Sequence, residues 1–322
     1  MNRQRDCLIF WIQSKKPSMK KMYIKNHPPQ YGAGYWIYRG YASAWEWLGY
    51  KVKYFDNLEE IEDDNYHIMT TDGTVSTDNL KILEKAKRVY LYVQPTKFPD
   101  PWGRHPNFQS LCPPAVREKI NTLENVYQWT YGDVTDFHNG WNNPATIKLA
   151  FDNINYKNNI DDKYFFDICF IGGLADNGFN EKQQIMLKHF TAFKDASERT
   201  GLKCGFFINQ NLSHEQEEKI LSTSVLSLNI HDAYQRELGL DTNERTFKSL
   251  GLCGALISDD IKQLKDTFPD VYTSNDPIEI VENVMKFLSL PKEEILKHKI
   301  KNIDNIQKNH TYINRAMVME KL

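Results

Sequence analysis

The chain has 322 residues, of which 41% are hydrophobic, and its 40 Lys and Arg against 42 Asp and Glu give a formal net charge of -2. This length predicts two domains, and the apolar fraction is large enough to fill two cores, which excludes an intrinsically disordered chain. The nearly balanced charge excludes an overall electrostatic attraction to nucleic acid or to an anionic membrane.

Short apolar runs alternate with helical periodicity along the first half of the chain. Such alternation predicts βαβ units and a largely parallel sheet. The first expected helix places Ile37, Tyr41 and Ala44 on one face. Strands are expected at residues 7–13, 51–55, 66–70, 88–94 and 125–131, and helices at residues 36–48 and 77–87.

Proline and aromatic residues crowd residues 95–114, which fit neither the helical nor the strand period. This stretch is expected to be an ordered functional loop or a lid. Its Phe98, Trp102 and Phe108 side chains either stack on a ring of a bound ligand or pack around the irregular backbone.

The polar residues 152–163 interrupt the pattern, and we interpret them as a linker between two domains. A second series of strands and helices follows them, which predicts a second sheet of the same kind. Strands are expected at residues 165–171, 203–208, 225–230 and 255–258, and helices at residues 181–199, 214–221, 243–250, 277–288 and 292–322.

One short helix of the second half is the most informative segment for function. Asp241 and Glu244 have the spacing of a capping box, and Gly251 is expected to end the helix. Backbone amides and the positive end of the helix dipole therefore gather near Asn243, where Arg245 adds a fixed charge and a two-pronged donor. This arrangement predicts a phosphate site, and an ordinary amphipathic helix with a solvated arginine is the alternative.

Three motifs lie near the start and in the last third of the chain: residues 31–35 (YGAGY), 243–257 (NERTFKSLGLCGALI) and 310–315 (HTYINR). Together they resemble the GT-B glycosyltransferases, in particular the spore-maturation-type branch of glycosyl transferases group 1. The resemblance implies an α/β fold in which two Rossmann-like domains face each other across a cleft.

The resemblance also implies a separate role for each domain. Residues 1–152 would form an acceptor-side domain, residues 153–300 a nucleotide-sugar-binding domain, and residues 301–322 a terminal helix that crosses back to the first domain. The implied activity is hexose transfer from a nucleotide diphosphate sugar, with UDP as the carrier, to a glycan, a protein or a small molecule, and a nucleic-acid acceptor stays open. The donor is a substrate, so no cofactor is expected, and the family works without a bound metal.

Loops that follow the expected strands supply further candidates, because ligands of open α/β sheets bind at the carboxyl ends of the strands. Glycines let a nucleotide approach the backbone, and Asn and His side chains suit a base or a ribose, whereas simple turn chemistry is the alternative. The donor-binding candidates are Gly32, Gly34, Gly172, Gly173, Asn209, His231, Asn243, Glu244 and Arg245.

Inverting transfer requires a base near the acceptor hydroxyl, and Asp72 and His105 are the catalytic candidates on loops of the first half, with His138 as a further histidine. For Asp72 the alternative is an ordinary Asp-Gly turn. Lys248 stands where relatives place a glutamate, and Leu240 stands eight residues earlier. These departures leave the ribose contact and the stereochemistry open, and they keep a non-catalytic nucleotide-sugar or glycan binding protein as an alternative.

A dinucleotide site is a third possibility, because Gly32 and Gly34 follow the first expected strand and Asp56 ends the second. Ile37 at the third glycine position and the long preceding loop argue against an NAD-dependent oxidoreductase. No C-x-x-C, H-E-x-x-H or D-x-D motif is present, so no metal site is expected. The paired aspartates at residues 63–64, 161–162 and 259–260 are interpreted as solvated turns.

The five cysteines are odd in number and widely spread, and Cys169 and Cys253 lie within expected apolar strands. This usage predicts buried thiols in a reducing compartment. No apolar run approaches the length of a bilayer span, so no membrane span is expected and the expected location is the cytoplasm.

Overall fold

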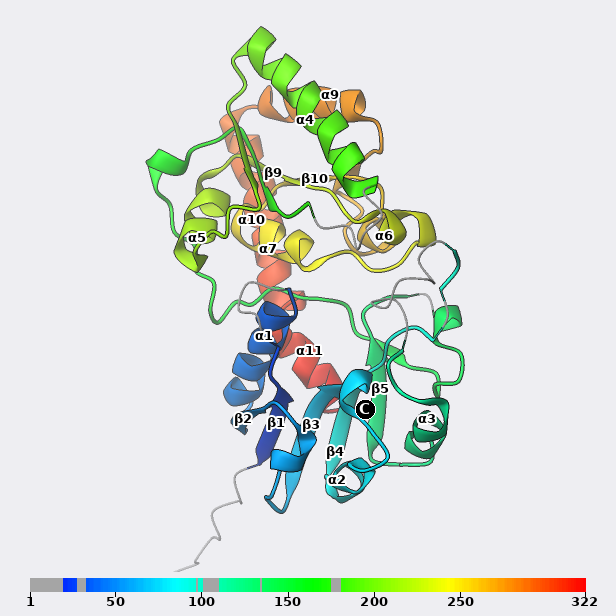
Figure 1. Ribbon diagram of the computed structural model, residues 1–322. Helices are drawn as coiled ribbons and strands as arrows, with labels where there is room; N and C mark the ends of the chain where they lie inside the picture. Colours follow the sequence, from blue (N-terminus) through cyan, green and yellow to red (C-terminus); the bar gives the residue numbers. More distant parts are fainter. Residues whose placement is uncertain (1–19, 28–32, 97, 101–109, 134, 175–180) are drawn as a thin grey trace, which may run out of the picture.

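The computed structural model describes residues 20–27, 33–96, 98–100, 110–133, 135–174 and 181–322. The described chain forms two parallel sheets, one from each half, and helices cover both faces of each sheet (Figure 1). The expected α/β class is therefore confirmed.

The first sheet has the strand order β2-β1-β3-β4-β5-β6, and all its pairs are parallel. Because side chains alternate along a strand, Met22 and Ile24 of β1 join the core under α1, whereas Tyr23 joins the core under α2 and α3. The elements of this half are β1 (Lys21–Lys25), α1 (Ala33–Trp47), β2 (Lys51–Phe55), β3 (Tyr66–Thr71), α2 (Leu80–Lys85), β4 (Arg88–Tyr92), α3 (Pro114–Ile120), β5 (Val126–Thr130) and β6 (Ala145–Thr146).

The second sheet has the order β11-β10-β9-β7-β8 and is also parallel. Ile168 and Phe170 of β7 pack under α4 and α9, and Cys169 between them faces the side of α5 and α7. The elements of this half are β7 (Ile168–Gly172), α4 (Glu181–Thr200), β8 (Cys204–Ile208), α5 (His214–Thr223), β9 (Leu226–Asn229), α6 (Ala233–Leu238), α7 (Glu244–Leu252), β10 (Leu256–Ser258), α8 (Lys262–Thr267), β11 (Tyr272–Thr273) and α9 (Pro277–Leu288), followed by α10 (Lys292–Asn309) and α11 (Tyr312–Met319).

Both sheets have the same topology. Counted from the first strand of each sheet, the order is 2-1-3-4-5 in both, with β6 added at one edge of the first. The winding therefore reverses at the β1–β3 pair and at the β7–β9 pair. Loops at the carboxyl ends of such pairs leave a crevice, which makes these two places the expected binding positions.

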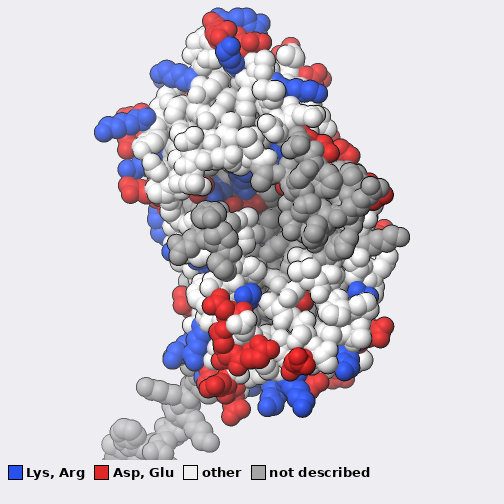
Figure 2. All heavy atoms as spheres, viewed as in Figure 1, with Lys and Arg blue, Asp and Glu red and all other residues white. Residues whose placement is uncertain are grey.

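The carboxyl ends of the two sheets approach each other. Gln263, in the first turn of α8, donates from Nε2 to the carbonyl of Tyr131, which directly follows β5, at 3.0 Å. Figure 2 shows this face of the molecule hollowed between the two halves, with basic atoms on the upper wall of the hollow.

The last two helices join the halves (Figure 1). α10 lies against α7, and α11 packs on α1 of the first half. Gly40 permits this close approach, because a Cβ there would lie 2.3 Å from the ring of Tyr312. Arg315 donates to the carbonyls of Lys148 at 2.8 Å and Leu149 at 3.1 Å, so α11 also holds the segment between the sheets. One apolar core consequently runs from the first sheet through α1 and α11 to α7.

The structure differs from the sequence predictions at several elements. β1 was not expected, because its three apolar residues stand between lysines, and the expected strand at residues 7–13 lies outside the described residues. The single helix expected over residues 292–322 is wrong: α10 ends at Asn309, and Thr311 starts α11 by accepting the N–H of Asn314 at 3.3 Å. α3, α6, α8, β6 and β11 are too short for a periodic pattern to predict them. Within the described chain, no helix combines the length and apolar character that a bilayer crossing needs.

Candidate functional site

α7 begins at the carboxyl end of β9, with Asn243 as its N-cap. The Asn243 side chain accepts the N–H of Thr246 at 3.3 Å, so the capping box expected at Asp241 is wrong by two residues. Gly251 does not end the helix either, because α7 continues to Leu252. A Cβ at Gly251 would lie 2.8 Å from the ring of Phe151, which makes this glycine a packing requirement.

Arg245, in the first turn of α7, lies directly beside the end of β7. Its Nη1 donates to Asn229 Oδ1 at 2.8 Å and to the carbonyl of Ile230 at 3.3 Å, and the guanidinium lies over the ring of Phe170, 5.2 Å from the centroid. A Cβ at Gly172 would lie 2.6 Å from Nη2. Gly172 is therefore the residue that lets the guanidinium lie against the backbone of β7.

A second cation lies near this arginine. Lys182, in the first turn of α4, has its Nζ 2.6 Å from Asp232 Oδ1, and the side chain of Lys182 is 7% exposed. Asp232 is the N-cap of α6 and also interacts electrostatically with Arg245. Burial acts to lower the pKa of Arg245, and Asp232 opposes this effect, so one carboxylate interacts with both cations.

Asn209 and Gly173 lie at the ends of the neighbouring strands. Asn209 has a φ of 52°, and its Oδ1 accepts the N–H of Leu174 at 3.1 Å. Its own N–H donates to the carbonyl of Gly172 at 3.0 Å. Asn209 thus holds the loop that follows β7, and through that loop it positions Gly173.

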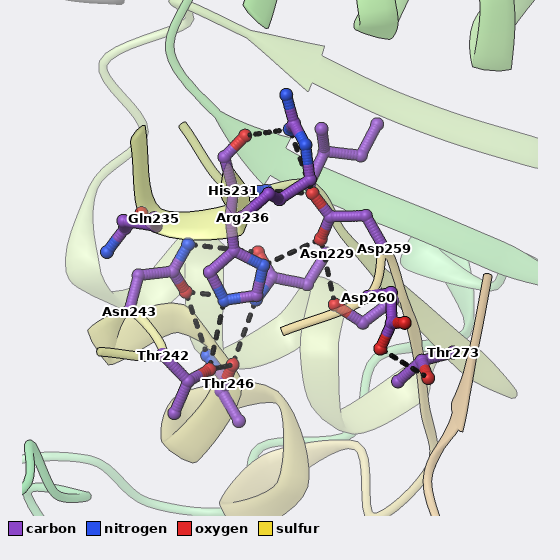
Figure 3. Close-up of polar contacts among 12 residues, drawn as sticks. Asn229, His231, Gln235, Arg236, Thr242, Asn243, Thr246, Asp259, Asp260 and Thr273 are labelled. Carbon is purple, nitrogen blue, oxygen red and sulfur yellow. Dashed lines mark hydrogen bonds and ion pairs between the residues drawn. The ribbon is translucent and has the colours of Figure 1, made fainter. Parts of the chain in front are cut away.

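His231 is fully buried at the end of β9 (Figure 3). Its Nδ1 lies 2.6 Å from Asp259 Oδ1, and its Nε2 lies 2.9 Å from Thr242 Oγ1. Arg236 donates to Asp259 Oδ2 at 3.1 Å. Asp259 is 1% exposed, so its interpretation as a solvated turn is wrong. Both ring nitrogens of His231 bind protein groups, and any contribution to ligand binding passes through those groups.

Lys248 forms a buried cluster on the inner side of α7. Its Nζ lies 2.9 Å from Glu217 Oε2 of α5 and 3.5 Å from Glu244 Oε1, and Tyr156 donates to Glu217 at 2.8 Å. Burial alone would lower the pKa of Lys248, but the two carboxylates outweigh burial and raise it. Burial raises the pKa of Glu244. The i,i+4 spacing predicts the contact with Glu244, whereas no signal in the sequence links Glu217 to α7.

Across the hollow, Asp72 lies in a 3₁₀ turn (Asp72–Thr74) at the carboxyl end of β3 and is fully buried. Its Oδ2 accepts from Ser110 Oγ at 2.6 Å and from the Gln94 N–H at 3.4 Å. Its Oδ1 and the hydroxyl of Tyr38 have no hydrogen-bond partner among the described residues. Burial raises the pKa of Asp72, so the carboxyl is poised to hold a proton more readily than a solvated aspartate.

The remaining predicted positions are spread along the first half. Gly34 lies in the first turn of α1, where a Cβ would be 3.4 Å from His27 Nδ1. His138 is buried, at 4% exposure. Gly32 and His105 lie outside the described residues, as do Trp102 and Phe108 of the aromatic loop. Asp56 accepts from the Asn26 side chain at 3.0 Å.

No group of three or more His, Cys, Asp or Glu suited to a metal ion occurs within the part of the chain that the structure describes.

The structure brings together four of the predicted donor-site residues at the β7–β9 switch point, namely Gly172, His231, Asn243 and Arg245. It places Asp72 on the opposite sheet. Sequence reasoning missed Lys182, Asn229 and Asp259, which complete the same site.

Comparison with known proteins agrees with this geometry. Residues 191–321 match the family model described as glycosyl transferase-like. No curated protein has a matching sequence. The spore-maturation branch stays a prediction.

Several solved structures are similar to the whole chain. T4 phage BGT in complex with UDP and Mn²⁺ is 14% identical, with 94% of this chain and 99% of that chain covered and a TM-score of 0.51. An alpha-glucosyltransferase in complex with UDP and a 13-mer DNA containing an HMU base is 11% identical, with 94% and 98% covered and a TM-score of 0.55. The N-terminal domain of Candida albicans trehalose-6-phosphate phosphatase is 8% identical, with 94% and 96% covered and a TM-score of 0.53. At these identities the likeness concerns the fold, and it confirms the expected pair of facing Rossmann-like sheets.

Proposed function

We propose that this chain, which has the GT-B fold and matches the glycosyl transferase-like family over residues 191–321, is a glycosyltransferase that uses a UDP-sugar as donor. The observation that carries the proposal is the position of Arg245. Its guanidinium and the amino end of α7 lie beside Gly172 at the β7–β9 switch point, where an α/β sheet binds its ligand.

The donor diphosphate would bind at the carboxyl end of β7, beside Gly172 and the amino end of α7. Arg245 supplies a fixed positive charge, and Lys182 supplies a second one once a phosphate competes for its bond with Asp232. Both charges would stabilise the nucleoside diphosphate as the bond to the sugar breaks. Glu244 lies in the same first turn, where its carboxylate is available to a ribose hydroxyl as well as to Lys248.

On the acceptor side, Asp72 is our candidate for the general base. Its unpartnered Oδ1 and the Tyr38 hydroxyl lie at the carboxyl end of the first sheet, on the side that faces the second sheet. A base with a raised pKa takes up the proton of an attacking hydroxyl more readily than an ordinary carboxylate. Access to Asp72 requires the groups around it to open, because its side chain is fully buried. His105 stays a prediction.

The acceptor is proposed only as a class: a hydroxyl of a glycan, a protein or a small molecule. A nucleic-acid hydroxyl is included because one similar structure holds DNA. We further propose that the enzyme needs no cofactor and no bound metal and that it works in the cytoplasm, in line with the free, buried thiols of Cys169 and Cys253.

The test is calorimetric binding of UDP, GDP and NAD, with hydrolysis of UDP-glucose followed in parallel. Removal of a charged hydrogen-bond donor should weaken UDP binding about 10- to 100-fold in Arg245→Ala, whereas Arg199→Ala, an exposed arginine on α4, should match the wild type. Repeating each titration with EDTA and with Mn²⁺ tests whether binding depends on a metal ion. Binding of NAD without UDP would overturn the proposal, and UDP-sugar binding without turnover by any acceptor would favour a non-catalytic sugar-nucleotide binding protein.

A further inference from the structure

We propose that a one-directional chain of buried hydrogen bonds, from Arg245 at the donor site to Asp259 beneath it, is a positioning device that fixes the guanidinium for the donor diphosphate. The inference rests on the proposed function and concerns the residues behind Arg245, which touch no substrate themselves. The chain runs from Arg245 to Asn229. It continues through Thr246, Thr242 and His231 to Asp259 (Figure 3).

At the Arg245 end of the chain, the orientation of the Asn229 side-chain amide is fixed. A guanidinium can only donate, so Asn229 must present Oδ1 to Arg245 Nη1 at 2.8 Å. Its Nδ2 then points the other way and donates to Thr246 Oγ1 at 2.9 Å and to Asn243 Oδ1 at 2.9 Å. An amide nitrogen cannot accept, so the Thr246 hydroxyl proton is left to point onward.

At the Asp259 end of the chain, separate contacts favour the same donor-to-acceptor direction of the hydrogen bonds. The Nδ1–H of His231 donates to Asp259 at 2.6 Å, and in this tautomer Nε2 accepts from the Thr242 hydroxyl at 2.9 Å. Thr242 Oγ1 can then accept from Thr246 Oγ1 at 2.7 Å. Burial alone would raise the pKa of Asp259, but the hydrogen bonds from His231 and the charge of Arg236 act in the opposite direction, and the pKa lies well below its usual range. The carboxylate therefore stays an acceptor, and every hydroxyl between it and the arginine has one preferred orientation.

This arrangement has a consequence for the ligand side of Arg245. Nη1 is held by Asn229 and by the Ile230 carbonyl, and Nη2 lies 2.6 Å from the position that a Cβ of Gly172 would take. The held edge stops the guanidinium from turning, and the other edge faces the β7 backbone where the diphosphate would lie. Successive bonds in such a chain polarise one another, so loss of one inner hydroxyl weakens the hold at the far end.

A matched control exists on the same two elements. Ser227 of β9 and Ser249 of α7 form a buried hydroxyl pair at 2.9 Å, and neither belongs to the chain. Removal of the Ser249 hydroxyl, like removal of the Thr246 hydroxyl, costs a buried hydrogen bond between β9 and α7. Of these two α7 hydroxyls, only that of Thr246 is connected to Arg245, through Asn229.

The experiment compares Thr246→Val, which keeps the shape and removes the hydroxyl, with Thr246→Ser, which keeps the hydroxyl, and with the control Ser249→Ala. UDP and uridine are titrated by calorimetry into each full-length variant, and urea unfolding gives the stability. Thr246→Val should lower the affinity for UDP about tenfold and leave the affinity for uridine within about twofold of the wild type, because the guanidinium binds the phosphates. Thr246→Ser should restore UDP binding, and Ser249→Ala should lose stability without losing UDP.

Two outcomes would overturn the inference. One is wild-type UDP affinity in Thr246→Val, and the other is an equal loss of UDP and uridine, which would show a general distortion of the site. Absence of UDP binding by the wild-type chain would instead overturn the proposed function and this inference with it.

Discussion

Asp241 lies in the turn before α7, and its replacement by asparagine is expected to stabilise the protein at neutral pH. Burial raises the pKa of this carboxyl from an ordinary 3.8 to about 6. A hydrogen bond from Gln235 Nε2 to Oδ2, at 3.2 Å, only partly offsets the loss of water. The substituted asparagine would keep a carbonyl oxygen for Gln235 and would carry no charge.

The sign and the size of this stabilisation follow from the pKa of Asp241 in the unfolded and in the folded state. Because the folded state holds its proton more tightly, the contribution of Asp241 to stability is fully present below pH 3.8 and is lost as the pH rises through 6. The ionised carboxyl therefore costs about 3 kcal/mol at neutral pH, since each pKa unit corresponds to about 1.4 kcal/mol. The free energy of unfolding of Asp241→Asn should exceed that of the wild type by about 1 kcal/mol at pH 4.5 and by about 3 kcal/mol at pH 8.

Urea unfolding, followed by tryptophan fluorescence from pH 4.5 to pH 8, measures this difference directly. Glu237→Gln is the control, because it removes an exposed carboxylate from the end of α6 in the same region. A difference that does not change with pH, or a loss of stability in Asp241→Asn at pH 8, would refute the reasoning.

Three further substitutions test other contacts. Gly172→Ala puts a Cβ 2.6 Å from the neighbouring guanidinium, so UDP affinity measured by calorimetry should fall about tenfold or more, and unchanged affinity would contradict the geometry. Gly40→Ala forces a Cβ to 2.3 Å from the ring of Tyr312 and should cost about 1–3 kcal/mol in urea unfolding, with part of the loss recovered by Tyr312→Leu in the same chain. Lys248→Met leaves Glu217, whose side chain is 18% exposed, without its cation and should cost about 1.5–3 kcal/mol, whereas Lys248→Met with Glu217→Gln should cost less. An equal cost for both would argue against an ion pair that stabilises the fold.

The alternation of apolar runs and helical periodicity predicts most of the fold, because parallel strands buried on both faces leave a strong sequence signal. β2, β3, β4 and β5, and β7 to β10 in the second half, all lie within a few residues of their expected ranges. The start and end of α7 were harder to predict. Asp241 and Asn243 are both good capping residues, and only the three-dimensional path of the chain decides which side chain reaches Thr246. Glycine is typical of a helix end, but at position 251 a glycine is required for another reason. The ring of Phe151, from the segment between the sheets, leaves no space for a Cβ there.

The candidate site was predicted in part. Gly172 and Arg245 were expected at the donor site on separate grounds, and the structure places them in contact. Asn229 gave no signal, because it ends a buried strand and carries the side chain of an ordinary turn residue. The sequence prediction for Asp259 is wrong, because an aspartate pair after a strand is typical of solvated turns. Only the packing of His231 and Arg236 around Asp259 makes it a buried anion.

The packing of α11 on α1 also constrains the order in which the molecule can be built. The face of α1 that Tyr312 covers is synthesised early, but its cover arrives only after the whole second sheet has been translated. A nascent first half must therefore carry an incomplete apolar layer while the second half emerges. Contacts of such long sequence separation slow folding and leave apolar surface exposed in the meantime. We infer that the two halves reach their final stability together, and that each depends on the other to complete its core.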